Sequence, residues 1–258
     1  MELTDIKIVS AIAIFVIGLG GGLAARRLAL GENGGRLLIA GNVFAGGVFL
    51  GAALIHVLPD AQEGFSQAYG DLGYPIYGLV CGLALGLMLA LEQVGHAFNR
   101  GADAARAYPL VLFLILSIHS VIAGFALGIE TMHLQAIVLL VAVLAHKGSA
   151  SFALGLSMLG DDGPGGKVAG PGYFRQIVFF SLMTPVGIGL GWGASMLVSG
   201  TGAVKFEAIF DALAAGTFLY VAVYEILRRE FSSREMLPLK VLSLGVGYGI
   251  MALIALWV

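Results

Sequence analysis

The chain has 258 residues, of which 59% are hydrophobic and only 12% are charged, and its formal net charge at pH 7 is −2. Soluble domains are roughly a quarter charged, so this composition excludes an ordinary soluble protein and indicates a membrane protein with several spans. The sequence has no basic patch interleaved with aromatic residues, which argues against nucleic acid as a partner. The single cysteine, Cys81, excludes an internal disulfide.

Apolar segments of membrane-spanning length follow one another along the chain. A bilayer core of ~30 Å needs about 20 apolar residues per helix, and on that length the sequence predicts an all-α membrane protein, a single domain (1–258) with eight transmembrane helices. The first is expected to be a true span rather than a cleaved signal. Pro59 and Asp60 are expected to end the second span, and Pro75 and Pro109 to begin the third and fourth. The predicted helices are about 6–29, 36–58, 75–93, 109–129, 133–158, 175–199, 206–227 and 238–257.

The distribution of Lys and Arg predicts the orientation of these spans, because cytoplasmic loops are enriched in both residues. The even-numbered connections carry several carboxylates, and Lys205 is their only Lys or Arg. We therefore expect the odd-numbered connections in the cytoplasm and both termini on the extracytoplasmic side of a plasma (inner) membrane. The basic residues of the odd-numbered connections are Arg26, Arg27, Arg36, Arg100, Arg106, Lys167, Arg175, Arg228, Arg229 and Arg234.

Two stretches in the middle of the chain share a pattern that begins with a histidine. Residues 119–128 read H-S-V-I-A-G-F-A-L-G and residues 146–155 read H-K-G-S-A-S-F-A-L-G. Ionisable side chains at membrane depth are costly and usually functional. Neutral imidazole is also the commonest side-chain ligand of transition metals, so the repeat indicates one metal site built by His119 and His146. Packing by hydrogen-bonded histidines is the alternative.

Other polar residues lie in or near the predicted spans. His56 and Asp60 share a helix face if the helix continues past Pro59, and otherwise form a polar helix end. Glu225 either lines a cavity or snorkels to the membrane surface. Lys147 is expected to lose its charge by desolvation, to pair with a carboxylate, or to snorkel.

The sixth span contains Pro185 and several glycines. These residues predict a kink or close helix packing.

Five stretches together resemble the ZIP (Zrt/Irt-like) family of divalent-metal transporters, in the branch that contains the human zinc importers. The resemblance covers nearly the whole chain. It implies eight spans, inverted repeats around a central helix pair, and a transport site between the fourth and fifth helices. The stretches that carry it are residues 46–60, 116–128, 145–148, 181–191 and 215–227.

The resemblance assigns roles to individual residues. His119 and His146 match the histidines of the transport site, and Ser120 takes a place that is Asn or Ser in the family. Lys147 matches a lysine that replaces a ligand of a second metal, which implies one metal ion. Three further pathway residues are matched, namely His56, Asp60 and Glu225.

One departure from the family pattern concerns the metal ligands. Where the family has a glutamate four residues after His119, this chain has Ala123. The resemblance otherwise implies a transporter that moves a divalent transition metal, expected to be Zn²⁺, toward the cytoplasm. Ala123 leaves open an alternative, a non-transporting or weakly active metal-binding protein such as a sensor or receptor.

The family mechanism implied is an elevator-like movement of helices 1, 4, 5 and 6 against helices 2, 3, 7 and 8. Glycines such as Gly124, Gly128 and Gly155 are expected to permit tight sliding contacts. Because neutral histidines bind metal, binding is expected to weaken below about pH 6.

The expected partners are the metal ion and the lipid bilayer, and a homodimer is left open. No cofactor is expected. A di-iron membrane enzyme is disfavoured because the five histidines form no HxxxH-type cluster.

Overall fold

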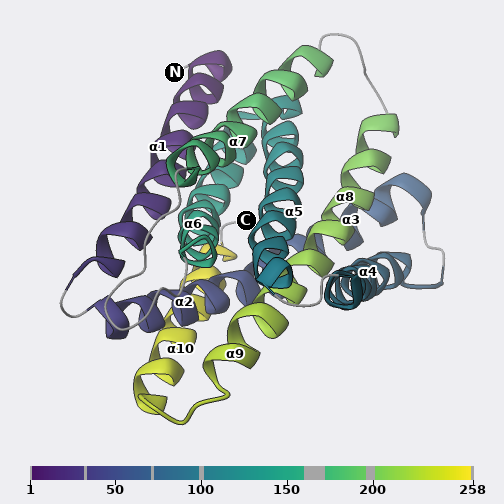
Figure 1. Ribbon diagram of the computed structural model, residues 1–258. Helices are drawn as coiled ribbons and strands as arrows, with labels where there is room; N and C mark the ends of the chain where they lie inside the picture. Colours follow the sequence, from purple (N-terminus) through teal and green to yellow (C-terminus); the bar gives the residue numbers. More distant parts are fainter. Residues whose placement is uncertain are drawn as a thin grey trace.

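The computed structural model describes residues 2–31, 34–70, 73–98, 102–159, 172–195 and 201–256, and within these ranges it contains helices and no β-strand. Their order is shown in Figure 1. The elements are α1 Leu3–Ala29, α2 Gly34–Gly51, the π-helix η1 Ala52–Val57, α3 Leu58–Tyr69, α4 Ile76–Phe98, α5 Ala102–Ile129, α6 His133–Ser157, α7 Tyr173–Ser195, α8 Thr201–Tyr220, the π-helix η2 Val221–Leu227, α9 Arg228–Glu230 and α10 Leu237–Ile254.

The helices agree with the predicted membrane fold. Among the described residues, seven helices are long and apolar enough to cross a membrane, and Ile76–Ala90 within α4 is a shorter apolar helix. Together they follow the order of the eight predicted spans, so the prediction of an all-α membrane protein is confirmed. Two spans are composite, one made of α2, η1 and α3 and the other of α8, η2 and α9.

The second span does not end at Pro59 as predicted. Its helix continues through α3 to Tyr69, with Pro59 in the first turn of α3. A proline inside a continuous membrane helix removes only its own backbone hydrogen bond and is tolerated there. The π-helix η1 directly before it shifts the hydrogen-bond register, so that Leu58 N–H donates to the Ala53 carbonyl.

Two more predicted boundaries were wrong. α5 begins at Ala102, seven residues before Pro109, and α4 extends to Phe98 instead of ending near residue 93. A proline in a membrane helix removes only its own hydrogen bond, and neighbouring groups can satisfy the freed carbonyl. The same holds for Pro185, which lies inside a continuous α7. The predicted end of the sixth span, near 199, lies outside the described residues.

The helices pack in two groups, which Figure 1 shows. In one group α1 packs against α6 and α7, and α7 packs against α5; in the other α2 packs against α10, and α8 packs against α3 and α4. In an inverted repeat of this kind, spans 1, 2 and 3 correspond to spans 6, 7 and 8, and span 4 corresponds to span 5. Under this correspondence the packed pair α1–α6 maps onto the pair α7–α5, and the pair α2–α10 maps onto the pair α8–α4. This is the symmetry that the predicted inverted repeats require.

Glycines bring α5 and α7 into direct backbone contact. A Cβ atom added to Gly124 of α5 would collide with the Thr184 carbonyl of α7, and one added to Gly187 of α7 would collide with the Val121 carbonyl of α5. Small residues allow membrane helices to approach in this way. The close packing predicted for the sixth span is therefore confirmed.

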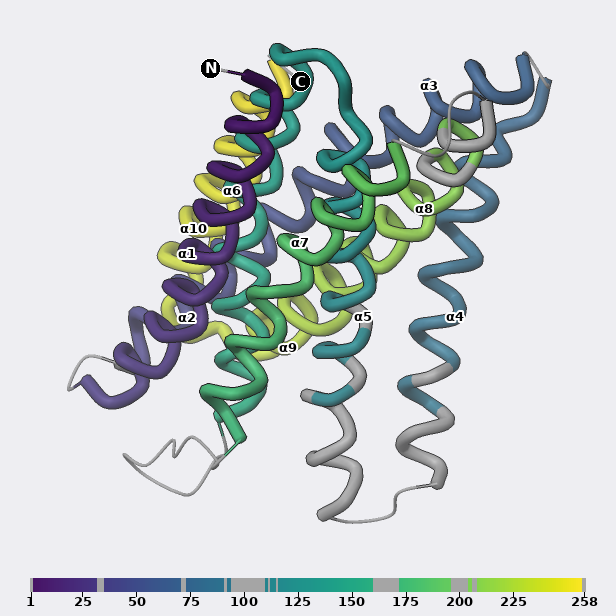
Figure 2. The backbone as a smooth tube through the Cα atoms, turned by 90° about the horizontal axis from the view of Figure 1, so that it is seen from above, coloured from purple at the N-terminus to yellow at the C-terminus, as the bar shows by residue number. Residues whose placement is uncertain are grey.

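Both ends of the chain lie at the same end of the molecule as the α5–α6 connection, as Figure 2 shows. The C-terminal end of α1 lies at the opposite end. This placement fits an even number of spans.

Candidate metal centre

The two histidines of the sequence repeat lie side by side between α5 and α6. Their ring centroids are 5.6 Å apart. Only 8% of His119 and 4% of His146 is exposed. Two imidazoles that share one tetrahedral Zn²⁺, with Zn–N distances of ~2.1 Å, place their ring centroids about 5 Å apart. A small adjustment would therefore let both rings bind one ion.

The short α5–α6 connection holds these helices at matching depth. The Glu130 carboxylate accepts the backbone N–H groups of Thr131 and Met132, at 2.6 and 2.7 Å, where α6 begins. A carboxylate is favourable at the N-terminus of a helix. At the end of α5, the ammonium of Lys7 from α1 donates a 2.6 Å hydrogen bond to the Gly128 carbonyl. The connection is thus held at both sides.

Phe218 of α8 closes one side of the histidine pair. Its ring centroid lies 4.1 Å from that of His119 and 5.4 Å from that of His146. The side chain is fully buried. Phe218 therefore brings the second group of helices into contact with both imidazoles.

His119 carries two buried polar atoms, its ring nitrogens. Among the described residues, neither ring nitrogen of His119 has a hydrogen-bond partner, and both are buried. A buried polar group without a partner is costly, and in native proteins it calls for an explanation. A bound cation would use one of these nitrogens.

A third histidine reaches the same region from the second span. His56 lies in η1, and its Nδ1 is 3.0 Å from Oδ2 of Asp60, one turn later. Because the helix continues past Pro59, the two side chains share one face, as the sequence allowed. His56 is buried, whereas 42% of the Asp60 side chain is exposed.

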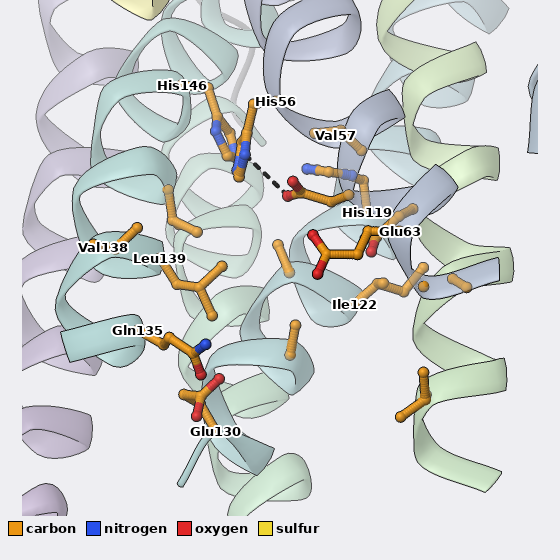
Figure 3. Close-up of a pocket in the computed structure, with 18 of the residues that line it drawn as sticks. His56, Val57, Glu63, His119, Ile122, Glu130, Gln135, Val138, Leu139 and His146 are labelled. Atoms are coloured by element: carbon orange, nitrogen blue, oxygen red, sulfur yellow. Dashed lines mark ion pairs between the residues drawn. The ribbon is translucent and has the colours of Figure 1, made fainter. Parts of the chain in front are cut away.

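A cavity of about 300 Å³ joins the three histidines to one end of the molecule. Figure 3 shows His56, His119 and His146 in this cavity, with Glu130 and Gln135 at its far end. Ala123, at the position of the missing glutamate, lines it as well. The carboxylates that line it are Asp60, Glu63, Glu130 and Asp211.

Lys147 and Ser120 bond to each other and not to groups in the cavity. The Lys147 ammonium donates to Oγ of Ser120 at 2.8 Å and to the Phe180 carbonyl at 3.0 Å. It also lies 3.6 Å from the centroid of the Phe180 ring. Lys147 is thus buried without snorkelling, and it meets neutral acceptors. Neither residue is among those that line the cavity.

Glu225 lies in the π-helix η2, outside the cavity. The Tyr220 hydroxyl donates to Oε1 of Glu225 at 2.8 Å, and Nη2 of Arg229 is 3.1 Å from Oε2. The Glu225 carboxylate is buried and is bonded to Tyr220 and Arg229, so it does not snorkel to the membrane surface.

The structure therefore brings four of the predicted residues to one cavity, namely His56, Asp60, His119 and His146, and places Ser120 and Glu225 apart from it. Within the described part of the chain, no three His, Cys, Asp or Glu side chains are yet close enough to hold a metal ion. Glu63 was missed as a cavity residue, although its spacing of three from Asp60 puts both on one helix face. Phe218 was missed because an apolar residue in an apolar span carries no signal.

The structure has helices of membrane-spanning length and a polar cavity that reaches buried histidines. These features define a polytopic membrane protein with a hydrophilic pathway into its interior. A model of the ZIP zinc transporter family matches residues 4–109 and 100–255. The chain belongs to this family.

Three curated relatives show how far the similarity extends. The chain is 42% identical over 81 residues to zinc transporter ZIP2 of Mus musculus, covering 31% of this chain and 26% of that protein. It is 40% identical over 76 residues to zinc transporter ZIP1 of Homo sapiens, with 29% and 22% covered. It is 35% identical over 83 residues to protein zntC of Dictyostelium discoideum, with 32% and 21% covered. In these matches the chain spans only about a quarter of the length of each relative.

Proposed function

We propose that the protein transports a divalent transition metal, with Zn²⁺ as the preferred cargo, across the membrane in which it lies. The observation that carries this proposal is the buried His119–His146 pair at the inner end of a polar cavity. A small adjustment would let both rings bind one ion, and His119 has no other partner for its nitrogens among the described residues. Membership of a zinc transporter family supports the same cargo.

The carboxylates of the cavity suit a cation pathway. Acidic side chains in a narrow cavity raise the local concentration of cations. Glu63 points into the cavity alongside the histidines, and Glu130 lies at its far end (Figure 3). The ion would lose its water stepwise on the way to the imidazoles. It is proposed to cross chemically unchanged, so the protein is no enzyme.

The movement we propose is a shift of one helix group against the other. The group of α1, α5, α6 and α7 carries both site histidines, and its members pack tightly on one another. The group of α2, α4, α8 and α10 contributes Phe218 and His56 through its composite spans. Movement of the first group would carry the ion past Phe218 and expose it on the other side.

The position of the cavity mouth supports assigning the structure to one conformational state of this movement. We propose that both termini, the α5–α6 connection and the cavity mouth lie on the extracytoplasmic side of a plasma (inner) membrane. The structure would then be an outward-facing state, and the cargo would move toward the cytoplasm. The homodimer stays a prediction, which the mass of the purified protein in detergent tests.

Metal flux in proteoliposomes tests the proposal. Wild type should take up Zn²⁺, whereas His119→Ala and His146→Ala should reduce uptake by at least tenfold. His133→Ala is the matched control, because His133 is an exposed histidine at the start of α6. Equal uptake by all four proteins would contradict the site assignment.

A non-transporting metal sensor is the second candidate, and Ala123 favours it. Ala123 offers no metal ligand at the place of the family's glutamate, so one ligand of the transport site is missing. Zn²⁺ binding by the purified protein, together with no flux in liposomes, would support the sensor and contradict transport.

A further inference from the structure

The sequence repeat also places a phenylalanine six residues after each site histidine, Phe125 after His119 and Phe152 after His146. α6 runs from the α5–α6 connection past His146 toward the opposite end of the molecule, as Figure 2 shows. At 1.5 Å per residue, Phe152 lies about 9 Å beyond His146 along the helix axis. Phe152 is therefore on the side of the histidine pair that faces away from the cavity mouth.

The cavity does not extend past the histidine pair along α6. The α6 residues that line it end at His146. Farther along, α6 packs against α2, and one buried apolar cluster contains Ala45 of α2 together with Ala150 and Ala153 of α6. Packed protein interiors leave little space for water. The contact between α2 and α6 therefore closes the pathway on this side of the histidines.

The ring of Phe152 fills a notch in α2 at Gly41. A Cβ atom added to Gly41 would lie 2.6 Å from Cζ and 2.8 Å from Cε1 of Phe152, closer than real atoms approach. The backbone nitrogen of Phe152 lies against α1, 3.2 Å from the place of a Cβ atom on Gly21. Phe152 is thus anchored to the first helix group by its backbone and inserted into the second by its ring.

The other half of the inverted repeat has no such notch. Gly41 stands eleven residues before the π-helix η1, which begins at Ala52, and the residue eleven before the start of η2, Val221, is Phe210. Under the span correspondence, contact of Phe152 with α2 maps onto contact of Phe125 with α8. A phenylalanine in place of Gly41 leaves no room for a second ring. The fitted contact therefore belongs to one of the two states only.

We propose that Phe152 and Gly41 form a latch that holds the pathway closed on the side away from the cavity mouth, so that the protein rests with its histidine pair open to the cavity. This inference rests on the proposed movement of the first helix group against the second. The ring must leave Gly41 before the groups can shift, because the notch is a single residue wide. A contact made in one state only shifts the equilibrium toward that state. The latch does so without touching the ion.

Two cysteine reporters distinguish the states in the purified full-length protein without metal, in a Cys81→Ser background. Ala45 lies one turn from Gly41 on the same face of α2 and is only 1% exposed. Ala45→Cys should therefore react slowly with a small water-soluble thiol reagent. Ile122 lines the cavity, as Figure 3 shows, so Ile122→Cys should react readily.

Gly41→Val should displace the ring of Phe152, and Phe152→Ala should remove it. Each change should raise the reaction rate of Ala45→Cys by about three- to tenfold and lower that of Ile122→Cys by about twofold, because the lost packing is present in one state only. Gly35→Ala is the matched control on α2, since a Cβ atom there meets nothing within 4 Å. It should change neither rate.

A compensating pair separates a fitted contact from a general loosening of the helices. In the Phe152→Ala background, the side chain of Gly41→Val finds the space that the ring has left. The double variant should therefore react more like wild type than either single variant. Faster reaction of both reporters in the single variants would overturn the latch, because the helices would merely be loosened. Thermal unfolding checks the fold, and Gly41→Ala replaces Gly41→Val if that variant does not fold.

The latch and the proposed transport fail on different results. Unchanged rates at both reporters in Gly41→Val and Phe152→Ala would overturn the latch, while uptake by His119→Ala and His146→Ala would still decide the proposed function. Opposite changes at the two reporters would support the latch even if wild type took up no Zn²⁺, a result that contradicts transport alone.

Discussion

Nζ of Lys147 donates a 2.8 Å hydrogen bond to Oγ of Ser120, and these two residues directly follow His146 and His119 in the sequence. The same ammonium bonds to the Phe180 carbonyl. One buried cation therefore joins α5, α6 and α7 just beside the histidine pair. We expect this contact to hold α5 and α6 in register beside the two imidazoles.

A double-mutant cycle tests this contact. Ser120→Ala should lower the free energy of unfolding by about 1–3 kcal/mol, because the buried ammonium loses an acceptor. In the Lys147→Met background the same substitution should cost close to nothing, since no ammonium remains. Denaturant unfolding of the four proteins in detergent measures the coupling. Equal costs in both backgrounds would show that the bond does not stabilise the fold.

The glycine contact between α5 and α7 predicts a difference between two nearby positions. A Cβ on Gly187 would collide with the α5 backbone, whereas one on Gly189 meets nothing within 4 Å. Gly187→Ala should therefore destabilise the protein by about 1–3 kcal/mol. Gly189→Ala should be neutral or stabilising by up to about 1 kcal/mol. Thermal unfolding of both variants is the measurement, and similar melting temperatures would argue against tight α5–α7 packing.

Phe218 is expected to support the site mechanically. Phe218→Ala should cost about 3–5 kcal/mol of stability, because it empties a fully buried site. It should also weaken Zn²⁺ binding, since the ring no longer holds His119 and His146 in place. Phe113→Ala is a suitable control, because Phe113 contacts Phe179, at 5.7 Å between centroids, on α7. Calorimetry should find unchanged Zn²⁺ affinity for the control, and equal affinities for both variants would refute the supporting role.

Maleimide labelling of single-cysteine variants tests the proposed orientation in the membrane. In a Cys81→Ser background, Glu2→Cys and Met132→Cys should react with a membrane-impermeant maleimide on intact cells. Ser232→Cys, in the connection between α9 and α10, should react only after permeabilisation. All three positions are exposed. The reverse labelling pattern would invert the topology and the assignment of the cavity to the outside.

Much of the fold could be predicted from the sequence because length and hydropathy alone decide a membrane span. The order of the spans and the pairing of His119 with His146 followed from apolar segment length and a visible repeat. Helix boundaries at prolines were predicted less well. Pro59 and Pro109 both lie in helices that continue, because a proline in a membrane helix removes only its own backbone hydrogen bond.

The rest of the site depends on contacts between distant segments. The π-helix η1 presents His56 to the cavity and packs on α8. No local sequence pattern predicts the shift in hydrogen-bond register that makes this segment a π-helix. The separation of Ser120 from the cavity depends on Lys147 reaching across to it. Glu63 is the exception, because its spacing from Asp60 was visible in the sequence.

The most direct test of the account is the position of bound zinc. Crystals of the protein grown with Zn²⁺, measured above and below the zinc absorption edge, give an anomalous map of the ion. We predict an intramembrane peak within about 2.0–2.5 Å of a ring nitrogen of both His119 and His146. A saturated zinc site elsewhere in the membrane, with no peak between these two rings, would contradict the account.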